Sequence, residues 1–276
     1  MEQTNGLIES LAAALPNVAA LAGQTVVVKI GGSTLGSHDT TLEDVVTLQR
    51  LGVSVVVVHG GGAVISGWLK RIGKVPEFVD GLRVTDAETM EIVVMALAGK
   101  VNKDLVSGLQ TLGGRPIGLC GLDGALLTGV RKDPRWGQVG KVTQVDLAPI
   151  RTLVAAGYVP VIAPIALGEG GEALNLNADT AAAEVASALG AAKLLFLTDV
   201  PGVKGADGEV IPALTEGEAK ELIASGVISG GMIPKVQACL RGLAGAKASH
   251  IIDGRVPHAI IQGLFTDRGV GTRFSI

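Results

Sequence analysis

Short apolar runs rich in β-branched residues alternate along this chain with segments whose apolar residues recur at helical spacing. Two such runs, Thr25–Ile30 and Val53–Val58, each lead into glycines, which is typical of a buried parallel strand followed by a tight loop. The same pattern predicts strands at residues 116–119, 159–163, 194–197 and 249–252, and β-hairpins between residues 125 and 145. This alternation of strands and helices indicates an α/β fold with a mainly parallel sheet and right-handed crossovers.

Helices are predicted from apolar spacing and from capping residues. The first runs from about Gly6 to Leu21 and contains Pro16, which we expect to kink it. A long helix that follows Thr85 is expected to reach about Leu112. Capping pairs, in which a threonine precedes an acidic residue by three positions, are predicted at Thr41 with Asp44, Thr85 with Glu88, and Thr215 with Glu218. Further helices are expected at residues 63–72, 148–156, 180–189, 232–246 and 257–265.

The clearest interruption of these patterns is the glycine-rich segment Gly168–Glu172. We therefore predict two lobes, an N-terminal lobe of residues 1–170 and a C-terminal lobe of residues 171–276. Gly168–Ala173 also matches the glycine spacing of a dinucleotide-binding loop, but an extended segment follows it instead of a helix, so we interpret the match as chance. The sequence contains no P-loop motif, no His-Glu-x-x-His zinc motif and no serine nucleophile elbow.

Composition and charge narrow the class of protein. Of the 276 residues, 47% are hydrophobic and only 3% are aromatic, so we expect a core of Val, Ile, Leu and Ala. The net charge of −3 and the lack of a basic run argue against a nucleic-acid partner. Cys120 and Cys239 lack metal-ligand spacing and are interpreted as buried thiols in a reducing compartment. Since no apolar run reaches bilayer length and Met1-Glu2-Gln3 lacks the basic start of a signal peptide, we expect a cytoplasmic protein without a membrane partner.

Candidate chemistry gathers where the first two strands end. Lys29 lies just before Gly31 and Gly32, and the second strand leads into Gly60–Gly62. In open α/β sheets, ligands bind beyond the carboxyl ends of the strands, and glycine lets backbone N–H groups approach an anion closely. The two loops and the lysine therefore indicate a site for a polyanion and a small acid.

Other polar residues lie just before or at the start of predicted helices. Asn175, Asn177 and Asp179 alternate ahead of an alanine-rich helix, where a turn-and-cap role and a functional role have about equal weight. Lys235 lies at the start of another helix, where the helix dipole disfavours a cation unless an anionic ligand is held there. For Arg83, a solvated loop arginine is the favoured interpretation on the residues alone.

His59 and Asp199 also follow buried strands. We interpret His59 as a histidine whose hydrogen bonds are satisfied at the strand end. The position of Asp199 fits a nucleotide, a metal ion or only the turn that it enters.

Six motifs occur in a fixed order: Lys29-Ile-Gly-Gly, His59-Gly-Gly-Gly, Gly81-Leu-Arg-Val-Thr, Asn175-Leu-Asn-Ala-Asp, Thr198-Asp-Val-Pro-Gly and Gly230-Gly-Met-Ile-Pro-Lys. With this set, the chain resembles the amino acid kinase family over nearly its whole length, from about Thr25 to Thr272. The resemblance implies an open, mainly parallel eight-stranded sheet sandwiched between helices. It also implies an N-terminal lobe that binds an amino-acid substrate and a C-terminal lobe that binds a nucleotide.

The reaction that the resemblance implies is transfer of the γ-phosphoryl group of ATP to the side-chain carboxylate of N-acetyl-L-glutamate. Lys29 and Lys235 would bracket the transferred group, Asp179 would orient both lysines, and the N–H groups of Gly31 and Gly32 would stabilise the phosphoryl oxygens. No general base is required, because the attacking carboxylate is already ionised at neutral pH. Mg²⁺ is expected to arrive on the nucleotide, without a metal site built by the protein.

The same resemblance assigns residues to the two substrates and implies a homo-oligomer. The protein would be a dimer, or a hexamer in which the first helix joins the dimers into a ring. The implied substrate-binding residues are Gly61, Gly62, Arg83 and Asn175, and the implied nucleotide-binding residues are Thr198, Asp199, Gly230 and Met232.

Two other functions stay open at this point. One is the same chemistry on N-acetyl-aminoadipate or on a carrier-linked acid. The other is a non-catalytic sensor of amino acids or nucleotides on the same fold, against which the joint presence of Lys29, Asp179 and Lys235 argues.

A further expectation concerns inhibition by arginine. The resemblance implies that regulated relatives contact the inhibitor through a histidine, a glutamate and a glycine. His250 and Gly269 match this pattern, but Gly263 stands at the place of the glutamate. We therefore expect weak or absent inhibition by arginine, because its guanidinium would lose a carboxylate partner.

Overall fold

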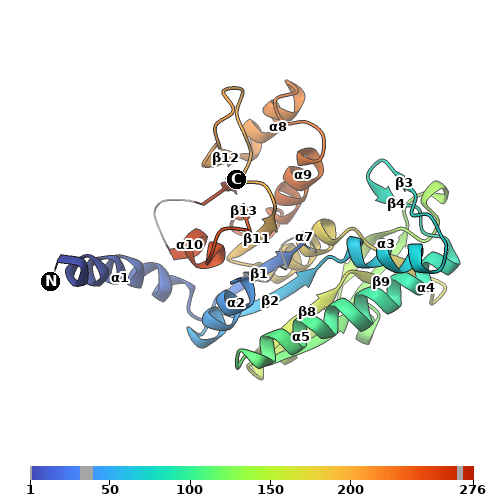
Figure 1. Cartoon of the computed structure of the whole chain (residues 1–276), viewed down its shortest axis with the longest axis horizontal. Coiled ribbons are helices and arrows are strands. Elements are labelled where there is room, and N and C mark those ends of the chain that lie inside the picture. Colours follow the sequence, from blue (N-terminus) through green and yellow to red (C-terminus); the bar gives the residue numbers. More distant parts are fainter. Residues whose placement is uncertain (1, 32–39, 266–269) are drawn as a thin grey trace.

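The computed structural model describes residues 2–31, 40–265 and 270–276, and the largest sheet in these ranges has eight strands (Figure 1). Their order is β12-β14-β13-β11-β1-β2-β8-β5, and the neighbouring strands are parallel except for β13 with β14. The mainly parallel eight-stranded sheet that the sequence led us to expect is thus confirmed. The strands are β1 (Thr25–Ile30), β2 (Ser54–His59), β5 (Pro116–Cys120), β8 (Val159–Ala163), β11 (Lys193–Thr198), β12 (Ala213–Thr215), β13 (Ser249–Asp253) and β14 (Thr272–Ser275).

The central strands are apolar on both faces because helices cover both sides of the sheet. In β1, Val26 and Val28 belong to the same core as residues of α2, α5 and α10, whereas Val27 belongs to the core that includes α6, α7 and α9. The alternation of side chains along a strand explains this division. These helices are α2 (Thr41–Arg50), α5 (Asn102–Thr111), α6 (Ala148–Ala155), α7 (Ala178–Leu189), α9 (Met232–Gly242) and α10 (Ala259–Phe265).

A second sheet of four strands lies beside the first, in the order β10-β9-β6-β7. Gly168–Glu172, where we placed the boundary between lobes, forms the turn between the antiparallel strands β9 and β10. The hairpin predicted between residues 125 and 145 is confirmed by the antiparallel pairing of β6 with β7. The strands are β6 (Leu127–Arg131), β7 (Gly140–Val145), β9 (Ile165–Gly168) and β10 (Ala173–Asn175).

The segment around Arg83 is a short β-hairpin, which the sequence interpretation as a loop missed. Strand β3 (Phe78–Val79) pairs with β4 (Leu82–Arg83), and the two turn residues, Asp80 and Gly81, both have positive φ. An Asp-Gly pair is the preferred sequence for such a turn, so the signal was present in the chain.

Two of the three predicted capping pairs are wrong. The helix α4 (Ala87–Val94) is capped by Asp86, which accepts a hydrogen bond from the Thr89 N–H, and the Thr85 hydroxyl instead donates to the Arg83 carbonyl. The residue before α2 is Thr40, and no side chain caps that helix. The third pair is confirmed: Thr215 and Glu218 form a capping box at α8 (Glu216–Ala224).

The long helix that was predicted to reach about Leu112 is continuous but changes its winding. Between α4 and α5 lies a π-helical segment, η1 (Met95–Val101). Its Leu97 is buried and approaches Gly61 so closely that a Cβ at Gly61 would lie 2.5 Å from the Leu97 Cδ2 atom. π-Helical turns are often found at functional sites, and here the segment packs against a glycine loop.

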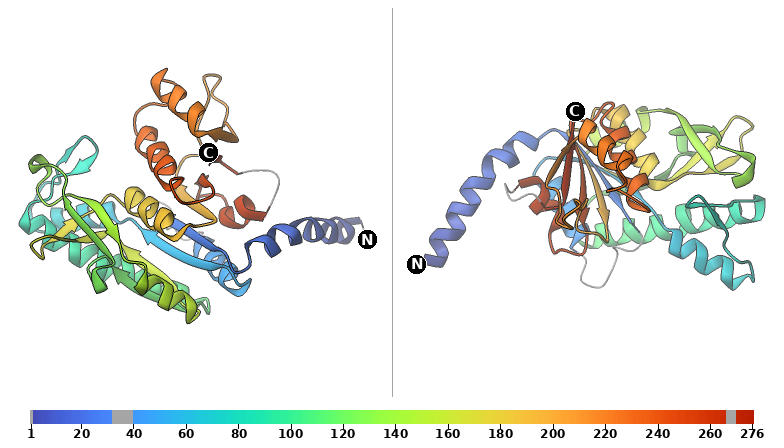
Figure 2. Two further views of the ribbon diagram at one scale, coloured as in Figure 1. Left: turned by 180° about the vertical axis from the view of Figure 1, so that it is seen from behind. Right: turned by 90° about the horizontal axis from the view of Figure 1, so that it is seen from above.

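Helix α1 (Glu2–Leu21) projects away from the sheet, as the view from above shows most clearly (Figure 2). It begins earlier than the predicted Gly6 and contains Pro16. Leu15 is 63% exposed, while Leu21 is buried where the helix joins the body. No helix in the described ranges combines the length and apolar character needed to span a bilayer.

The buried carboxylate of Asp44 links α2 to α10. It accepts hydrogen bonds from the ring Nδ1 of His258 at 2.7 Å and from the backbone N–H of Ile260 at 3.1 Å. Burial raises the pKa of this carboxyl above its usual value, although His258 opposes the rise. Asp44 thus binds the start of α10 and does not cap α2.

We expect Asp44→Ala to lower the free energy of unfolding by about 1–3 kcal/mol, because the buried Ile260 N–H would lose its acceptor. Chemical denaturation of the purified protein measures this loss. Glu43→Ala is the matched control, since Glu43 is exposed in the same turn of α2. Equal stability of the two variants would show that Asp44 has no such structural role.

Candidate active site

The carboxyl ends of three neighbouring strands bring the predicted motifs together. Ile30 of β1 lies beside His59 of β2 on one side and beside Leu197 of β11 on the other. Gly31 therefore follows β1 between the loop that begins at Gly60 and the one that begins at Asp199. Gly31 and these two loops lie at the edge of the sheet where ligands bind in open α/β folds.

A carboxylate lies between two lysines at this edge. The Nζ of Lys29 is 2.7 Å from Asp179 Oδ1, and the Nζ of Lys235 is 3.5 Å from Asp179 Oδ2. Lys29 comes from β1, Asp179 from the first turn of α7, and Lys235 from the first turn of α9. In β1 the side chain of Lys29 lies on the same face as Val27, which is the face that α7 and α9 cover.

The charges of this group stabilise one another. Burial opposes ionisation of Asp179, but the charges of Lys29 and Lys235 outweigh it, and the pKa of the carboxyl lies below its usual value. The side chains of Lys29 and Asp179 are only 9% and 13% exposed, while that of Lys235 is 26% exposed. The group therefore presents two ammonium ions and one carboxylate that is already engaged, which suits a ligand rich in negative charge.

The Asn175–Asp179 motif divides into three different roles. Asn177 is the N-cap of α7 and accepts a hydrogen bond from the Thr180 N–H at 2.9 Å, as the structural interpretation of this motif predicts. Asp179 binds the lysines. Asn175 donates from Nδ2 to the Thr85 hydroxyl at 3.1 Å, so this motif is fastened to the chain beside Arg83.

A cavity of about 200 Å³ lies next to these residues, between the glycine loop after β2 and the β3–β4 hairpin. A larger cavity of about 680 Å³ shares Leu82 and Asn177 with it and extends to Pro234 of α9. The small cavity is lined by Gly60, Gly61, Gly62, Phe78, Arg83, Leu97 and Asn175, among others.

Arg83 is buried in the wall of this cavity, which contradicts its interpretation as a solvated arginine. Only 7% of the residue is exposed, and its guanidinium carbon lies 4.7 Å from the centre of the Phe78 ring. Nη2 donates to the Gly62 carbonyl at 2.9 Å and to the Ser66 hydroxyl at 2.8 Å. Nη1 is buried without a hydrogen-bond partner in the described part of the chain, and burial lowers the pKa of this side chain.

An unpaired cationic donor in a small cavity fits a ligand carboxylate, because a buried guanidinium is costly to leave without an acceptor. Gly62 lies directly beside this guanidinium, since a Cβ there would be in van der Waals contact with Arg83 Nη2 at 3.9 Å. Sequence reasoning missed several apolar residues of this wall, among them Phe78 and Leu97. The Asp-Gly turn was the available signal for Phe78, whereas nothing local marks Leu97.

His59 has a structural role, as predicted. It is 1% exposed, its Nδ1 donates to the Gly60 carbonyl at 2.8 Å, and its Nε2 accepts from Asn102 Nδ2 at 3.2 Å. Burial lowers its pKa to about 4, so the ring is neutral at physiological pH. It therefore fixes the start of the glycine loop without adding charge.

The four residues expected to bind nucleotide are only partly brought together. Met232, the first residue of α9, lines a mainly apolar cavity of about 280 Å³ with Val200, Gly202 and Ile228. Thr198 is buried at the end of β11, and its hydroxyl donates to Asp199 Oδ1 at 3.2 Å. These two residues and Gly230 belong to the flanking segments and do not line the cavity.

The remaining predictions concern phosphate binding by Gly31 and Gly32 and inhibition by arginine. Gly32 and Gly269 lie outside the described residues, whereas Gly31 lies within them. His250 is buried in β13, and a Cβ at Gly263 would lie 2.6 Å from Ile252 Cδ1, so a glutamate there would require Ile252 to move. Weak inhibition by arginine thus stays a prediction.

Among the described residues, the site contains neither a cysteine nor a cluster of metal ligands. Cys120 and Cys239 are free and buried. Within the described ranges, no group of three or more His, Cys, Asp or Glu side chains is arranged to hold a metal ion.

The chain is similar in sequence to acetylglutamate kinases and similar in structure to an N-acetylglutamate synthase. The acetylglutamate kinase of Synechococcus sp. is 48% identical over 273 residues, covering 96% of this chain and 91% of that protein. The acetylglutamate kinase of Moorella thermoacetica is 46% identical, with 99% and 97% covered. The solved N-acetylglutamate synthase from Neisseria gonorrhoeae, complexed with coenzyme A and N-acetyl-glutamate, superposes with a TM-score of 0.85 at 26% identity. That match covers 98% of this chain but 63% of the synthase, so the chain spans less than two thirds of the synthase.

A match to a family profile identifies the family. The sequence profile of the amino acid kinase family matches residues 24–253, which include all six motifs and the Lys29–Asp179–Lys235 group. Together with the near-complete coverage of the curated relatives, this match leads to one conclusion: the chain belongs to the amino acid kinase family.

Proposed function

We propose that this protein transfers the γ-phosphoryl group of ATP to the side-chain carboxylate of N-acetyl-L-glutamate, giving N-acetylglutamyl 5-phosphate in arginine biosynthesis. The observation that carries the proposal is the pairing of Asp179 with Lys29 and Lys235 beside a small cavity that contains the unpartnered Nη1 of Arg83. The 48% identity to an acetylglutamate kinase supports the choice of substrate.

The acid is proposed to bind in the small cavity. Arg83 Nη1 would meet its α-carboxylate, and Asn175 would hold the same end of the molecule. Gly61 and Gly62 lie in the same wall, and their N–H groups would bind further oxygens of the acid. The side-chain carboxylate would then point toward Lys29, at the carboxyl end of β1.

The phosphoryl group is proposed to move between the two lysines. Phosphoryl transfer depends mainly on in-line positioning and on neutralising charge that spreads over the moving group. Lys29 and Lys235 supply two compact positive charges, and Gly31 and Gly32 would add N–H donors. Asp179 would hold both lysines in place through its two carboxylate oxygens. It is not needed as a base, because the attacking carboxylate is ionised at neutral pH.

The nucleotide is proposed to occupy the lobe of residues 171–276, and the acid the lobe of residues 1–170. The apolar cavity that includes Met232 suits a base, and Thr198, Asp199 and Gly230 flank it. The cationic and N–H groups around Lys29 fit phosphate oxygens, while Asp179 is already bound to both lysines. Mg²⁺ would therefore be held by the nucleotide phosphates, where it would neutralise part of their charge.

Release of ADP with a panel of acids tests the proposed substrate. We expect rapid ADP release with N-acetyl-L-glutamate and little with L-glutamate or N-acetyl-L-aminoadipate. Preference for N-acetyl-L-aminoadipate would show that the longer acid is the substrate. ADP release with no acid in the panel would instead favour a sensor or a different acceptor.

Both catalytic lysines should matter for turnover. Lys29→Ala and Lys235→Ala should each lower kcat by roughly 100-fold or more while the KM for the acid changes little, because each charge acts mainly on the transition state. Steady-state kinetics with both substrates measures this. Lys247→Ala, at an exposed position, is the control. Near-normal turnover of Lys235→Ala would rule out the proposed mechanism.

Arg83→Lys should raise the KM for N-acetyl-L-glutamate roughly tenfold or more while the KM for ATP stays within about twofold, because lysine keeps one charge but loses the planar guanidinium. The same kinetic assay separates the two constants. Arg151→Lys, on the exposed surface of α6, serves as the matched control. A shift confined to ATP would place Arg83 in the nucleotide site.

We also propose that the protein is a homo-oligomer, a dimer or a hexamer, and that α1 joins its dimers. Helix α1 projects from the body (Figure 2), and although Ala14, Val18 and Leu21 pack against the core, Leu15 is left 63% exposed and available to a second subunit.

Deletion of residues 1–20 should therefore reduce the particle to a dimer in light scattering, because the surface joining the dimers is removed. ADP release by the shortened protein provides the control for folding. An unchanged particle mass would contradict the role of α1.

A further inference from the structure

The hairpin that carries Arg83 has little internal structure of its own. We refer to residues 75–85, between α3 (Gly62–Arg71) and α4, as the flap. Its two strands pair through Phe78 with Arg83 and Val79 with Leu82, and the Val84 N–H donates to the Glu77 carbonyl at 3.0 Å. Val75 is 77% exposed and Phe78 is 56% exposed, so burial of apolar surface contributes little. A two-stranded hairpin of this kind is marginally stable alone and depends on contacts outside it. One of these is the hydrogen bond from Trp136 Nε1 to the Val79 carbonyl at 3.1 Å, and others lie at the two ends of the flap.

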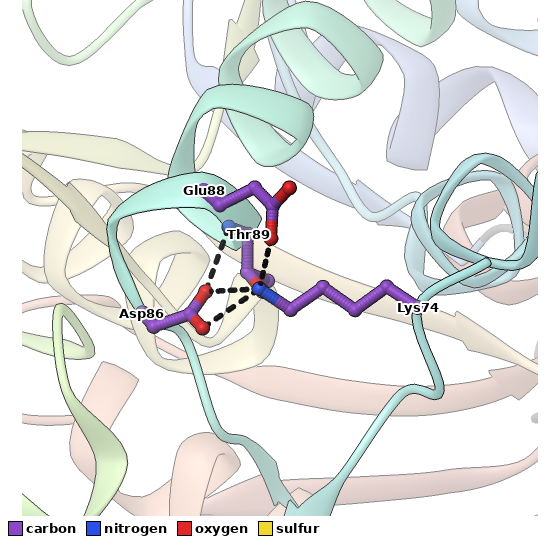
Figure 3. Close-up of polar contacts among 4 residues, drawn as sticks. All are labelled: Lys74, Asp86, Glu88 and Thr89. Carbon is purple, nitrogen blue, oxygen red and sulfur yellow. Dashed lines mark hydrogen bonds and ion pairs between the residues drawn. The ribbon is translucent and has the colours of Figure 1, made fainter. Parts of the chain in front are cut away.

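One ammonium group joins the two ends of the flap. The Nζ of Lys74 lies 2.7 Å from both carboxylate oxygens of Asp86 and 2.8 Å from Glu88 Oε2 (Figure 3). Lys74 is the residue just before the flap and Asp86 is the residue just after it. Figure 3 shows the ammonium between the two carboxylates, with the Thr89 N–H bound to the same carboxylate of Asp86.

Both ends of this contact are fixed to helices. The Lys74 N–H donates to the Leu69 carbonyl at 2.9 Å, which ties Lys74 to the last turn of α3. Asp86 is the N-cap of α4 and accepts from the Thr89 N–H at 2.8 Å. The ion pairs therefore connect the end of one helix to the start of the next, and the flap is the loop that they close.

Lys74 and Asp86 are both charged at neutral pH. The hydrogen bonds from Lys74 lower the pKa of Asp86 to about 2, and those carboxylates raise the pKa of Lys74. Because the pKa of Asp86 is lowered, its contribution is present above the usual carboxyl pKa and is lost only as the pH falls toward 2. A single exposed ion pair contributes little, but here one ammonium binds three carboxylate oxygens and closes a loop.

We propose that Lys74, Asp86 and Glu88 form a clamp that holds the flap closed against the site, and that Lys74 is a positioning residue that sets the affinity for the acid through Arg83. Lys74 does not line the acid cavity, so its effect passes through the flap. The kinetic part of this proposal rests on the proposed function, whereas the ordering of the flap does not.

Hydrogen–deuterium exchange of the free, full-length protein tests the clamp without any substrate. Lys74→Met keeps the alkyl chain but removes the charge, and should speed exchange across residues 75–85, including the Val84 N–H that donates to the Glu77 carbonyl. Lys74→Arg should restore slow exchange. Lys70→Met, on the exposed surface of α3, is the matched control. Asp86→Asn keeps the N-cap and should resemble Lys74→Met.

Steady-state kinetics on the same variants tests the consequence for binding. Lys74→Met should raise the KM for N-acetyl-L-glutamate about three- to tenfold and leave the KM for ATP and kcat within about twofold, since the loss falls on binding of one substrate. Lys74→Arg should restore the KM for the acid, and Lys70→Met should leave both constants unchanged.

Each result decides a different part of the proposal. Unchanged exchange in Lys74→Met would overturn the clamp, whatever the kinetics. Faster exchange with an unchanged KM for the acid would overturn the positioning role. If the wild-type protein phosphorylates no acid, the proposed function fails, while the exchange data still decide whether the clamp orders the flap.

Discussion

The site depends on one buried carboxylate that holds two ammonium groups together. Lys29 and Lys235 come from β1 and α9, and without Asp179 their like charges would repel one another. Asp179 lies in the first turn of α7, where Asn177 has already capped the helix, so its carboxylate is available to the lysines. The sheet order makes this geometry possible, because β1 lies between β2 and β11 and its lysine faces the side that carries α7 and α9.

Much of the fold was predictable because its signals are local. The Val-rich runs at β1 and β2 are buried on both faces, which gives continuous apolar strands that end in glycines. The failed capping pairs show where local reasoning ends. Asp44 and Thr85 have the right spacing for caps, but their side chains bind the distant residues Ile260 and Asn175. Spacing along a chain carries no information about partners that only folding brings near.

The site shows the same division between local and distant signals. The residues alone gave a cap and a functional role equal weight at Asn175–Asp179, and the structure contains both. The residues alone favour a solvated Arg83, because a lone arginine in a predicted loop gives no hint of burial, yet the fold buries it between Phe78 and Gly62. Nothing in the sequence marked Lys74 as a structural residue, since its acidic partners Asp86 and Glu88 lie beyond the flap in the chain. The catalytic roles were inferred from the resemblance of six ordered motifs to a family. The fold is what brings the residues of these motifs close together.

A crystal structure of the protein with MgADP, aluminium fluoride and N-acetyl-L-glutamate tests the central claim most directly. Aluminium fluoride stands in for the phosphoryl group during transfer. We expect the Nζ atoms of Lys29 and Lys235 both to contact it, Asp179 to contact the lysines and not the fluoride, and Arg83 to contact the α-carboxylate of the acid. A complex in which either lysine lies away from the fluoride, or in which Arg83 faces the nucleotide, would contradict this claim.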